Sequence, residues 1–349
     1  MLKILTFYSI LLNLLSTGSC CRWALYASSI QPIEPAKLWS ESSHSLIRQS
    51  YLPPYLPNIS EQLLYDVDKN FERNHKVNQD GWGFGWYETE AGEEAGEKNM
   101  QPRRYRSSNG ATSNPLNTTD PELVAQIFQQ SIFSRVLFAH IRASTDGVPS
   151  ENNSHPFVFG RLLFMHNGGI HNKVALVDDL SNCSGLHQLV TGDTDTEWGG
   201  ALFASFLHVQ KKDNEEINVC HYQTDFSMAE LRNAMKKTVA RLSSDQSGGS
   251  SLNLAVSNGV YVIAIRYRTL INEEPPSLYY SFVNSSLWVA SEPLDQEGGH
   301  EREWVLMAKD QMVTFDTSTN ELSLECLTKA CEDELEYRKS TVPMFLKDM

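Results

Sequence analysis

The chain has few basic residues and only one long apolar run, and each shortage excludes a class of protein. Twenty-nine Lys and Arg stand against 43 Asp and Glu, which gives a formal net charge of −14. So acidic a chain binds phosphate backbones poorly, and we expect no nucleic-acid partner. After the first 20 residues, no stretch reaches the roughly 20 consecutive apolar residues of a membrane helix. We therefore expect no transmembrane span in the mature chain.

Metal-ligand spacing is also lacking. No group of His and Cys residues has the spacing of a zinc site. The acidic segment Gly192–Glu197 lacks the closing glycine and glutamate of an EF-hand loop. The sequence therefore predicts no metal site.

What is present is the composition of a folded enzyme. The 349 residues are 41% hydrophobic and 10% aromatic, enough to build a substantial core. Strand and helix patterns alternate without an internal repeat, which favours layered sheets flanked by helices. We predict helices at 44–50, 121–133, 194–207 and 228–242, a solvated loop at 88–117, and strands at 22–27, 82–87, 136–141, 162–166, 252–256, 261–267, 278–283, 287–290, 305–307 and 312–315.

Residues 1–20 have the pattern of a signal peptide or a short propeptide. Lys3 precedes the apolar run Ile4–Leu15, and small residues follow it. The cleavage pattern fits a cut before Cys20 or before Cys21, and a misassigned start codon or a retained anchor stays open. A secreted chain is the expectation that follows from a genuine leader; a misassigned start would make the protein cytoplasmic.

A cut before Cys21 would make a thiol the first residue of the mature chain. Its free α-amine, with an ordinary pKa of about 7.7–8.0, could then accept the thiol proton. An internal cysteine lacks that base.

Two further features accord with a secreted glycoprotein. Four more cysteines allow two disulfides in three pairings, or four buried thiols; they are Cys183, Cys220, Cys326 and Cys331. Five Asn-x-Ser/Thr acceptor patterns occur; they begin at Asn58, Asn117, Asn152, Asn182 and Asn284.

Several polar segments are candidates for a site, and each also has a structural interpretation. In 78–87, glycines alternate with aromatic residues, which favours tight sheet packing over a pocket. Arg142 ends a strand, where a guanidinium binds a substrate carboxylate or makes a structural ion pair. His155 precedes a proline, where a turn-stabilising hydrogen bond is the simple explanation.

Two further segments also have both a functional and a structural interpretation. Asn167 and Gly168 offer two N–H donors suited to an oxyanion, although Asn-Gly by itself favours a tight turn. In 192–197, Asp or Thr is an ordinary helix N-cap, and a carboxylate there is also suited to a substrate ammonium.

Six motifs in order carry a family resemblance. They are Cys-Arg-Trp at 21–23, Asp-Gly-x-Gly-x-Gly-Trp-Tyr at 80–87, His-x-Arg-x-Ser-Thr at 140–145, His-Pro-Phe at 155–157, His-Asn-Gly at 166–168 and Asp-Thr-Asp-Thr-Glu at 193–197. Together they resemble the class II glutamine amidotransferases, which are N-terminal nucleophile hydrolases. The similarity is closest to a stand-alone branch that includes the glutathione-degrading amidotransferase-like component and the γ-glutamyl amidohydrolase of ergothioneine synthesis.

The resemblance implies an α+β fold, the four-layer α/β/β/α sandwich of these hydrolases. It extends from Cys21 to about Phe315 and places the amidotransferase domain at 21–320, after the leader at 1–20 and before a C-terminal tail at 321–349.

The same resemblance assigns roles to individual residues. It implies that Cys21 is the nucleophile and that Asn167 and Gly168 form the oxyanion hole. Arg142 would bind the substrate α-carboxylate and Asp195 its α-ammonium, while Thr145 and His155 match positions that line the glutamine pocket. Ala143 and Asp146 stand where many synthase-linked relatives have Trp and His, so coupling to a synthase is in doubt.

The implied activity is hydrolysis of the γ-amide of glutamine or another small γ-glutamyl compound through a cysteine thioester. No metal or organic cofactor is required. A separate peptidase or synthase subunit is an alternative partner, with this chain supplying ammonia in the second case. A non-catalytic secreted protein that binds γ-glutamyl compounds is the alternative from another class.

Overall fold

The computed structural model describes most of the chain after the leader, in eleven ranges. They are residues 21–52, 54–57, 80–87, 101–110, 127, 132–144, 147–180, 184–207, 226–245, 248–295 and 302–341. The leader 1–20 lies outside them, and so does most of the helix predicted at 121–133. Thr145, Cys183, Cys220 and the acceptors Asn58, Asn117 and Asn182 also lie outside the described residues.

One layer is a seven-stranded antiparallel sheet with β1 in its middle. The order is β11-β9-β10-β1-β4-β2-β3. The strands are β1 (Arg22–Ser28), β2 (Trp82–Tyr87), β3 (Pro102–Ser107), β4 (Val136–Ile141), β9 (Tyr279–Val283), β10 (Ser286–Ala290) and β11 (Val305–Leu306). β1 is apolar on both faces because both faces are covered, and its alternate residues enter two different cores.

The second layer is a six-stranded antiparallel sheet in the order β13-β12-β8-β7-β6-β5. Its strands are β5 (Phe157–Phe159), β6 (Leu162–Gly169), β7 (Ser251–Ser257), β8 (Tyr261–Arg268), β12 (Gln311–Asp316) and β13 (Glu321–Cys326). The antiparallel neighbours β6, β7 and β8 pair along their lengths, which places the Asn167-Gly168 end of β6 beside the start of β7.

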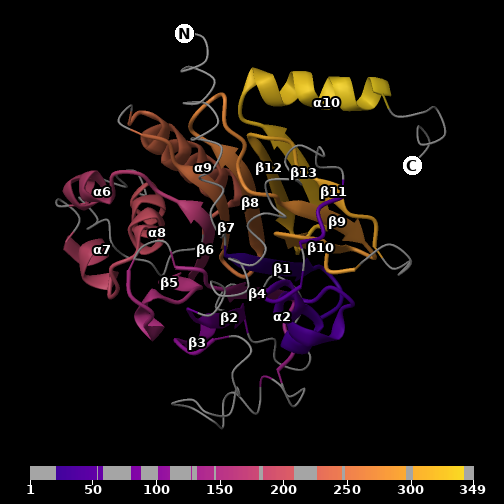
Figure 1. Cartoon of the computed structure of the whole chain (residues 1–349), viewed down its shortest axis with the longest axis horizontal. Coiled ribbons are helices and arrows are strands. Elements are labelled where there is room, and N and C mark those ends of the chain that lie inside the picture. The colour runs from indigo at the N-terminus through magenta and orange to yellow at the C-terminus, as the bar shows by residue number, and fades with distance from the viewer. Residues whose placement is uncertain are drawn as a thin grey trace, which may run out of the picture.

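Three buried clusters separate the molecule into four layers. The cluster between the sheets includes Trp23, Phe138 and Met165. The outer face of the six-stranded sheet packs on α8 (Asp195–Ser205) and α9 (Met228–Ser243), with α6 (Lys173–Asp179) beside them. The outer face of the seven-stranded sheet packs on the short helices η1 (Lys37–Glu41) and α2 (Leu46–Gln49). Figure 1 shows the two sets of helices on opposite sides of the sheets, so the predicted α/β/β/α sandwich is confirmed.

All ten predicted strands are present, and the strands that were not predicted lie at sheet edges. Strands 82–87 and 136–141 have their predicted bounds. The loop predicted at 88–117 is wrong at β3, an edge strand whose arginines give it no apolar pattern. The short edge strand β5 was not predicted. The short helices α6, α7 (Ser184–Leu189) and η2 (Glu151–Asn153) were not predicted either.

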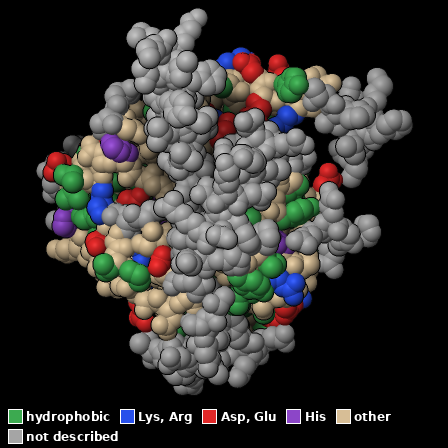
Figure 2. All heavy atoms as spheres, viewed as in Figure 1, with side chains coloured by type: hydrophobic (Ala, Val, Ile, Leu, Met, Phe, Trp, Pro, Cys, Tyr) green, Lys and Arg blue, Asp and Glu red, His purple; other side chains and the backbone are tan. Residues whose placement is uncertain are grey.

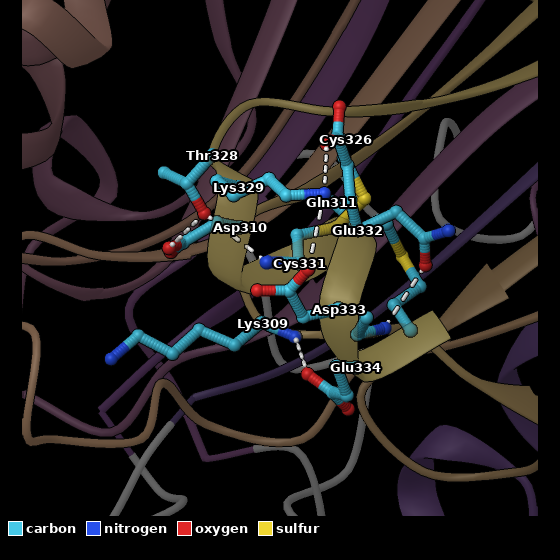
Figure 3. The surroundings of a disulfide bond; sticks show 12 residues. Lys309, Asp310, Gln311, Cys326, Thr328, Lys329, Cys331, Glu332, Asp333 and Glu334 are labelled. Atoms are coloured by element: carbon cyan, nitrogen blue, oxygen red, sulfur yellow. Dashed lines mark hydrogen bonds and ion pairs between the residues drawn. A yellow bond between two sulfur atoms is a disulfide. The ribbon is translucent and has the colours of Figure 1, made fainter. Parts of the chain in front are cut away.

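The segment expected as a C-terminal tail begins inside the sheet. β13 pairs with β12 over its whole length, and α10 (Lys329–Thr341) follows. A disulfide joins Cys326, the last residue of β13, to Cys331 in α10 (Figure 3). For these two cysteines the buried-thiol alternative is therefore wrong.

Among the described residues, no helix is both long and apolar enough to cross a membrane. On the face seen in Figure 2, charged side chains of both signs lie among hydrophobic ones.

Candidate functional site

Cys21 lies directly before β1, where the chain enters the seven-stranded sheet. Its half-buried thiol contacts the backbone of Ala143: the Ala143 N–H donates to Sγ at 3.3 Å, and Sγ lies 3.5 Å from the Ala143 carbonyl oxygen. Because β1 pairs with β4 from Arg22 and Ile141 onward, the thiol meets the chain just past the end of β4. The same strand end therefore places Cys21 beside the residue that follows Arg142.

Arg142 is only 2% exposed, and its guanidinium stabilises the loop that follows β4. It donates to the carbonyls of Gly147 and Val148 and to the Ser144 hydroxyl, each at 3.1 Å. The Asp80 carboxylate accepts from the Ser144 N–H at 2.7 Å and fixes the same loop to the start of β2. Arg142 is therefore held in position by the loop that it stabilises.

Asn167 and Gly168 lie near the end of β6 in the other sheet. The register pairs Asn167 with Asn253 and Gly168 with Leu252, so these residues continue the strand. The tight turn that Asn-Gly favours is therefore wrong here. Gly168 has φ +145°, and a Cβ on it would lie 2.0 Å from the Ser251 carbonyl oxygen.

A single hydroxyl connects Asn167 to the strand that carries the thiol. The Asn167 Nδ2 donates to the Ser291 Oγ at 3.4 Å, and the Trp23 N–H donates to the same oxygen at 3.1 Å. Asn167 is 1% exposed, and its Oδ1 has no hydrogen-bond partner in the described part of the chain. The Asn167 amide is thus connected to a residue two positions from Cys21.

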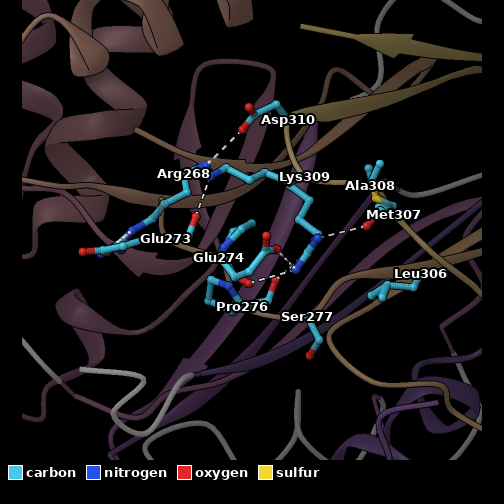
Figure 4. A network of polar contacts seen from close by, with 12 residues as sticks. Arg268, Glu273, Glu274, Pro276, Ser277, Leu306, Met307, Ala308, Lys309 and Asp310 are labelled. Atoms are coloured by element: carbon cyan, nitrogen blue, oxygen red, sulfur yellow. Dashed lines mark hydrogen bonds and ion pairs between the residues drawn. The ribbon is translucent and has the colours of Figure 1, made fainter. Parts of the chain in front are cut away.

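The segment before β9 supports Ser291. The Ser277 hydroxyl donates to the Ser291 carbonyl at 2.7 Å. Ahead of Ser277, the Pro276 carbonyl accepts from the buried Arg266 guanidinium and from Asn253, both at 3.0 Å. Glu274 also accepts from Arg266 at 3.1 Å, and Figure 4 shows Glu274, Pro276 and Ser277 in this segment.

Asp195 opens α8 beside the end of β6. Its Oδ2 accepts from the Ile170 N–H at 2.6 Å, and a Cβ on Gly169 would lie 3.9 Å from that oxygen. The N-cap is Thr194, whose hydroxyl accepts from the Glu197 N–H at 3.2 Å. The N-cap interpretation is therefore correct for Thr194, while the Asp195 carboxylate lies against the last residues of β6.

His140, His155 and His166 form a buried group next to these residues. The His140 Nε2 donates to the His166 carbonyl at 3.1 Å, and the His166 Nε2 donates to the Ser251 carbonyl at 2.7 Å. The rings of His140 and His155 stack at 3.9 Å. Neither ring nitrogen of His155 has a hydrogen-bond partner among the described residues, so the predicted turn-stabilising bond is absent.

Burial controls the charge of these histidines. It lowers the pKa of His140 to about 3 and holds the pKa of His155 well below its ordinary value, and neighbouring charges, including Arg142, add to both shifts. Burial also lowers the pKa of His166, against the opposing influence of the Asp195 carboxylate. All three are neutral at neutral pH.

The glycine-aromatic segment packs the sheets together, as its pattern favoured. A Cβ on Gly83 would lie 2.2 Å from the His155 carbonyl oxygen, and one on Gly85 would lie 2.6 Å from the Pro156 ring. The glycines therefore let the segment at 155–156 approach β2 closely.

Sequence reasoning missed Glu292, which binds Arg22, the residue after Cys21. It is 1% exposed and accepts from the Arg22 Nε at 2.5 Å, the His44 Nε2 at 2.8 Å and the Tyr55 N–H at 2.8 Å. Burial raises the pKa of Glu292, but the Arg22 charge and the His44 hydrogen bond outweigh burial and lower it overall. The signal in the sequence was a Ser-Glu pair directly after the apolar strand predicted at 287–290.

Among the described candidate residues, Cys21 and Arg142 lie where the start of β1 meets the end of β4, and Asn167, Gly168 and Asp195 lie at the end of β6 and the start of α8. Cys21 contacts Ala143 beside Arg142, Asn167 is linked to β1 through Ser291, and Asp195 lies against the end of β6. Thr145 lies outside the described residues. Within the described ranges, no group of three or more His, Cys, Asp or Glu side chains could hold a metal ion.

Comparison with known proteins identifies relatives for this arrangement. Residues 68–334 match the sequence model of the family described as glutamine amidotransferases class-II. The chain is 30% identical to the probable glutamine amidotransferase DUG3 of Saccharomyces cerevisiae, over 92% of this chain and 89% of that protein. It is also 40% identical over 75 residues to a glutamine–fructose-6-phosphate aminotransferase of Acinetobacter baylyi, which is 22% of this chain and 12% of that protein.

Solved structures show more distant similarities. A glutamine aminotransferase class-II domain protein from Silicibacter pomeroyi is 19% identical, with a TM-score of 0.49 over 88% of this chain and 99% of that one. An allosteric regulatory enzyme of purine biosynthesis is 14% identical, with a TM-score of 0.48 over 89% of this chain and 49% of that one. The fold assignment rests instead on the two sheets and their covering helices.

Proposed function

The chain belongs to the class II glutamine amidotransferases, and from that premise we propose that it hydrolyses a γ-glutamyl amide through a thioester on Cys21. The observation that carries the proposal is the position of the Cys21 thiol, 3.3 Å from the Ala143 amide nitrogen and so beside Arg142. The family match begins at residue 68, so the role of Cys21 rests on this geometry and on the motif at 21–23.

Arg142 and Asp195 would bind the amino-acid end of the substrate. A guanidinium binds a carboxylate through two parallel hydrogen bonds, and a carboxylate binds an ammonium group. Both side chains are held by backbone groups, Arg142 by the loop at 147–148 and Asp195 by Ile170. Such fixed contacts orient a flexible substrate so that its δ-carbonyl lies over the thiol.

The reaction proceeds through a tetrahedral oxyanion and a thioester on Cys21. The α-amine of a first-residue Cys21 accepts the thiol proton, and Sγ attacks the δ-carbon to give a tetrahedral oxyanion. Asn167 has two N–H groups on Nδ2, so the bond to Ser291 leaves one for the oxyanion, and the Gly168 N–H is the second donor. Collapse releases ammonia or an amine, and water hydrolyses the γ-glutamyl thioester to glutamate and free thiol.

We also propose that the mature protein is secreted and glycosylated. The pattern at 1–20 supports export, and both acceptor asparagines that lie within the described residues, Asn152 and Asn284, are exposed. Digestion with an N-glycanase should reduce the mass of the secreted protein, and an unchanged mass would contradict glycosylation.

The decisive experiment combines N-terminal sequencing with a substrate panel. We expect mature protein that begins at Cys21 to release glutamate from glutamine, glutathione or another γ-glutamyl amide. A glutamine-derived electrophile should add one adduct to Cys21, and Cys21→Ala should abolish both the adduct and turnover. Removal of one oxyanion donor, in Asn167→Ala, should lower kcat by about 10²–10³.

Controls distinguish the alternatives. The double variant Cys326→Ser/Cys331→Ser removes both sulfurs of the disulfide and should keep the single adduct, which tests for unspecific labelling. Labelling that persists in Cys21→Ala would refute the assigned nucleophile. Binding of γ-glutamyl compounds without turnover would favour the secreted binding protein, and turnover that requires an added synthase would favour an ammonia-supplying subunit.

A further inference from the structure

A nucleophile at the first position lies on the part of a chain that is hardest to hold still. Chain ends fray unless other contacts fix them. On one side, β1 is paired with β4 as far as Arg22. On the side of β10, the strand pairing begins only at Ala24 with Ala290, so the two residues between Cys21 and Ala24 need other partners.

The two residues after β10 supply those partners. Ser291 donates its N–H to the Trp23 carbonyl at 2.9 Å and accepts from the Trp23 N–H at 3.1 Å. Glu292 holds Arg22 at 2.5 Å, and the Arg22 Nη1 lies 3.4 Å from the Cys21 carbonyl oxygen, to which it donates. The side chain of Glu292 therefore holds Arg22, which lies beyond the last residue pair of β1 and β10.

Glu292 is also the point at which three separate segments meet. Its carboxylate accepts from His44, at the start of the α2 region, and from the backbone of Tyr55, in addition to Arg22. The Gln49 amide donates to the carbonyl oxygens of both His44 and Glu292, at 2.9 and 3.3 Å. A buried carboxylate is costly unless donors surround it, and here three donors do so.

We infer that Glu292 is a positioning residue, which fixes Arg22 and thereby holds Cys21 in place for attack. The inference rests on the proposed function, because it concerns the geometry of the same thiol. Glu292 acts through Arg22, whose side chain it holds and whose Nη1 donates to the Cys21 carbonyl oxygen. Loss of the carboxylate should therefore affect the chemical step more than substrate binding, which is assigned to Arg142 and Asp195.

The experiment compares Glu292→Gln with Asp295→Asn in the full mature enzyme. Asp295 lies three residues further on and forms an ion pair with Arg302 at 2.5 Å, and within the described ranges its carboxylate makes no hydrogen bond or ion pair with β1. Each variant removes one partner of a largely buried ion pair, so both should lose stability. We expect Glu292→Gln to lower kcat about 10- to 100-fold with KM within about twofold, since small displacements of a reacting group have effects of this size.

Further measurements separate positioning from stability. Glu292→Asp keeps the charge and should recover part of kcat, while Asp295→Asn should keep the kcat of the parent enzyme. Hydrogen exchange should be faster at the amides of Arg22 and Trp23 in Glu292→Gln than in Asp295→Asn. Equal kcat in Glu292→Gln and the parent, or equal losses in both variants, would overturn the inference.

The exchange measurement also keeps this inference distinct from the proposed function. If the parent enzyme cleaves no γ-glutamyl amide, the proposed function fails, but the amides of Arg22 and Trp23 still report whether Glu292 holds the start of β1. Unchanged exchange in Glu292→Gln would refute the inference even in an active enzyme.

Discussion

At Gly168 the backbone conformation and the proposed role of the N–H as an oxyanion donor depend on the same residue. Its φ of +145° lies in a region that L-residues rarely adopt, and the Ser251 carbonyl oxygen occupies the space of a Cβ at 2.0 Å. The proposed oxyanion donor is the N–H of this same residue. Backbone strain and donor geometry are therefore coupled here.

We predict that Gly168→Ala destabilises the protein by at least about 1–3 kcal/mol, the usual cost of a strained backbone position. The clash must also move the Gly168 N–H, so activity should fall further than the loss of folded protein explains. Urea unfolding and a glutamate-release assay at a fully folded temperature measure the two effects.

Gly169→Ala is the matched control. A Cβ there meets its nearest neighbour, the Asp195 Oδ2, only at 3.9 Å, which is ordinary contact. Its stability should stay within about 0.5 kcal/mol of the parent, as for a substitution that creates no clash. Equal destabilisation by the two alanines would show that the Ser251 carbonyl does not restrict position 168.

At this scale the sequence identified the residues but misjudged their backbone. Asn167 and Gly168 were candidates from their chemistry, yet Asn-Gly favours a turn and the structure continues the strand. Pairing with β7, a long-range contact, decides the conformation, and a local pattern carries no information about it. Glu292 was missed for the same reason, since its partners at 22 and 44 are far away in the sequence.

At the scale of elements, α8 shows how a helix end places a functional group. Thr194 caps the helix through the Glu197 N–H, and the Glu197 carboxylate accepts from the Gly192 N–H at 2.7 Å. These reciprocal bonds fix the first turn, and Asp195 is its first residue. The cap therefore determines where the Asp195 carboxylate lies relative to β6.

We predict that Thr194→Val lowers stability by about 1 kcal/mol, the usual cost of a lost N-cap. Because the start of α8 would loosen, KM for the γ-glutamyl substrate should rise more than kcat falls. Thr194→Ser keeps the hydroxyl and should match the parent in both measurements. A rise in KM in the serine variant equal to that in the valine variant would contradict a role for the cap.

The strands that sequence reasoning missed, β3, β5 and β13, all lie at sheet edges, whereas every inner strand was predicted. The inner strands β2 and β4 are buried at every position, and their predicted bounds were correct. β3 has two buried residues and β13 has none, and their charged residues made them resemble a loop and a tail. An edge strand is defined by a neighbour across the sheet, which the segment itself does not encode.

At the scale of the whole molecule, the buried histidines connect stability to pH. The pKa of His140 is lowered to about 3, and those of His155 and His166 are also lowered, mainly by burial between the layers. In the unfolded chain each would titrate near an ordinary pKa of about 6.5. Below that pH, the unfolded state binds protons that the folded state does not.

Acid should therefore destabilise the protein well before its carboxylates titrate. Each histidine that stays neutral in the fold removes about 1.4 kcal/mol of stability per pH unit below about pH 6.5. Glu292 acts in a lower window: its pKa is lowered, so its contribution is present above about pH 4.3 and is lost only as pH falls further. Between pH 6.5 and 5 the histidines should dominate the slope.

Urea unfolding at pH 8, 6.5 and 5.5, followed by tryptophan fluorescence, measures that slope. His155→Phe keeps an aromatic ring on His140 but removes one titrating group, so the loss of stability between pH 6.5 and 5.5 should shrink by about 1 kcal/mol. Above about pH 7.5 an unfolded histidine carries no proton, so the difference in unfolding free energy between the two proteins should no longer change with pH. Burial against His140 and the charge of Arg142 are the reasons why His155 should stay neutral in the folded protein. The same pH dependence of stability in parent and variant would contradict this.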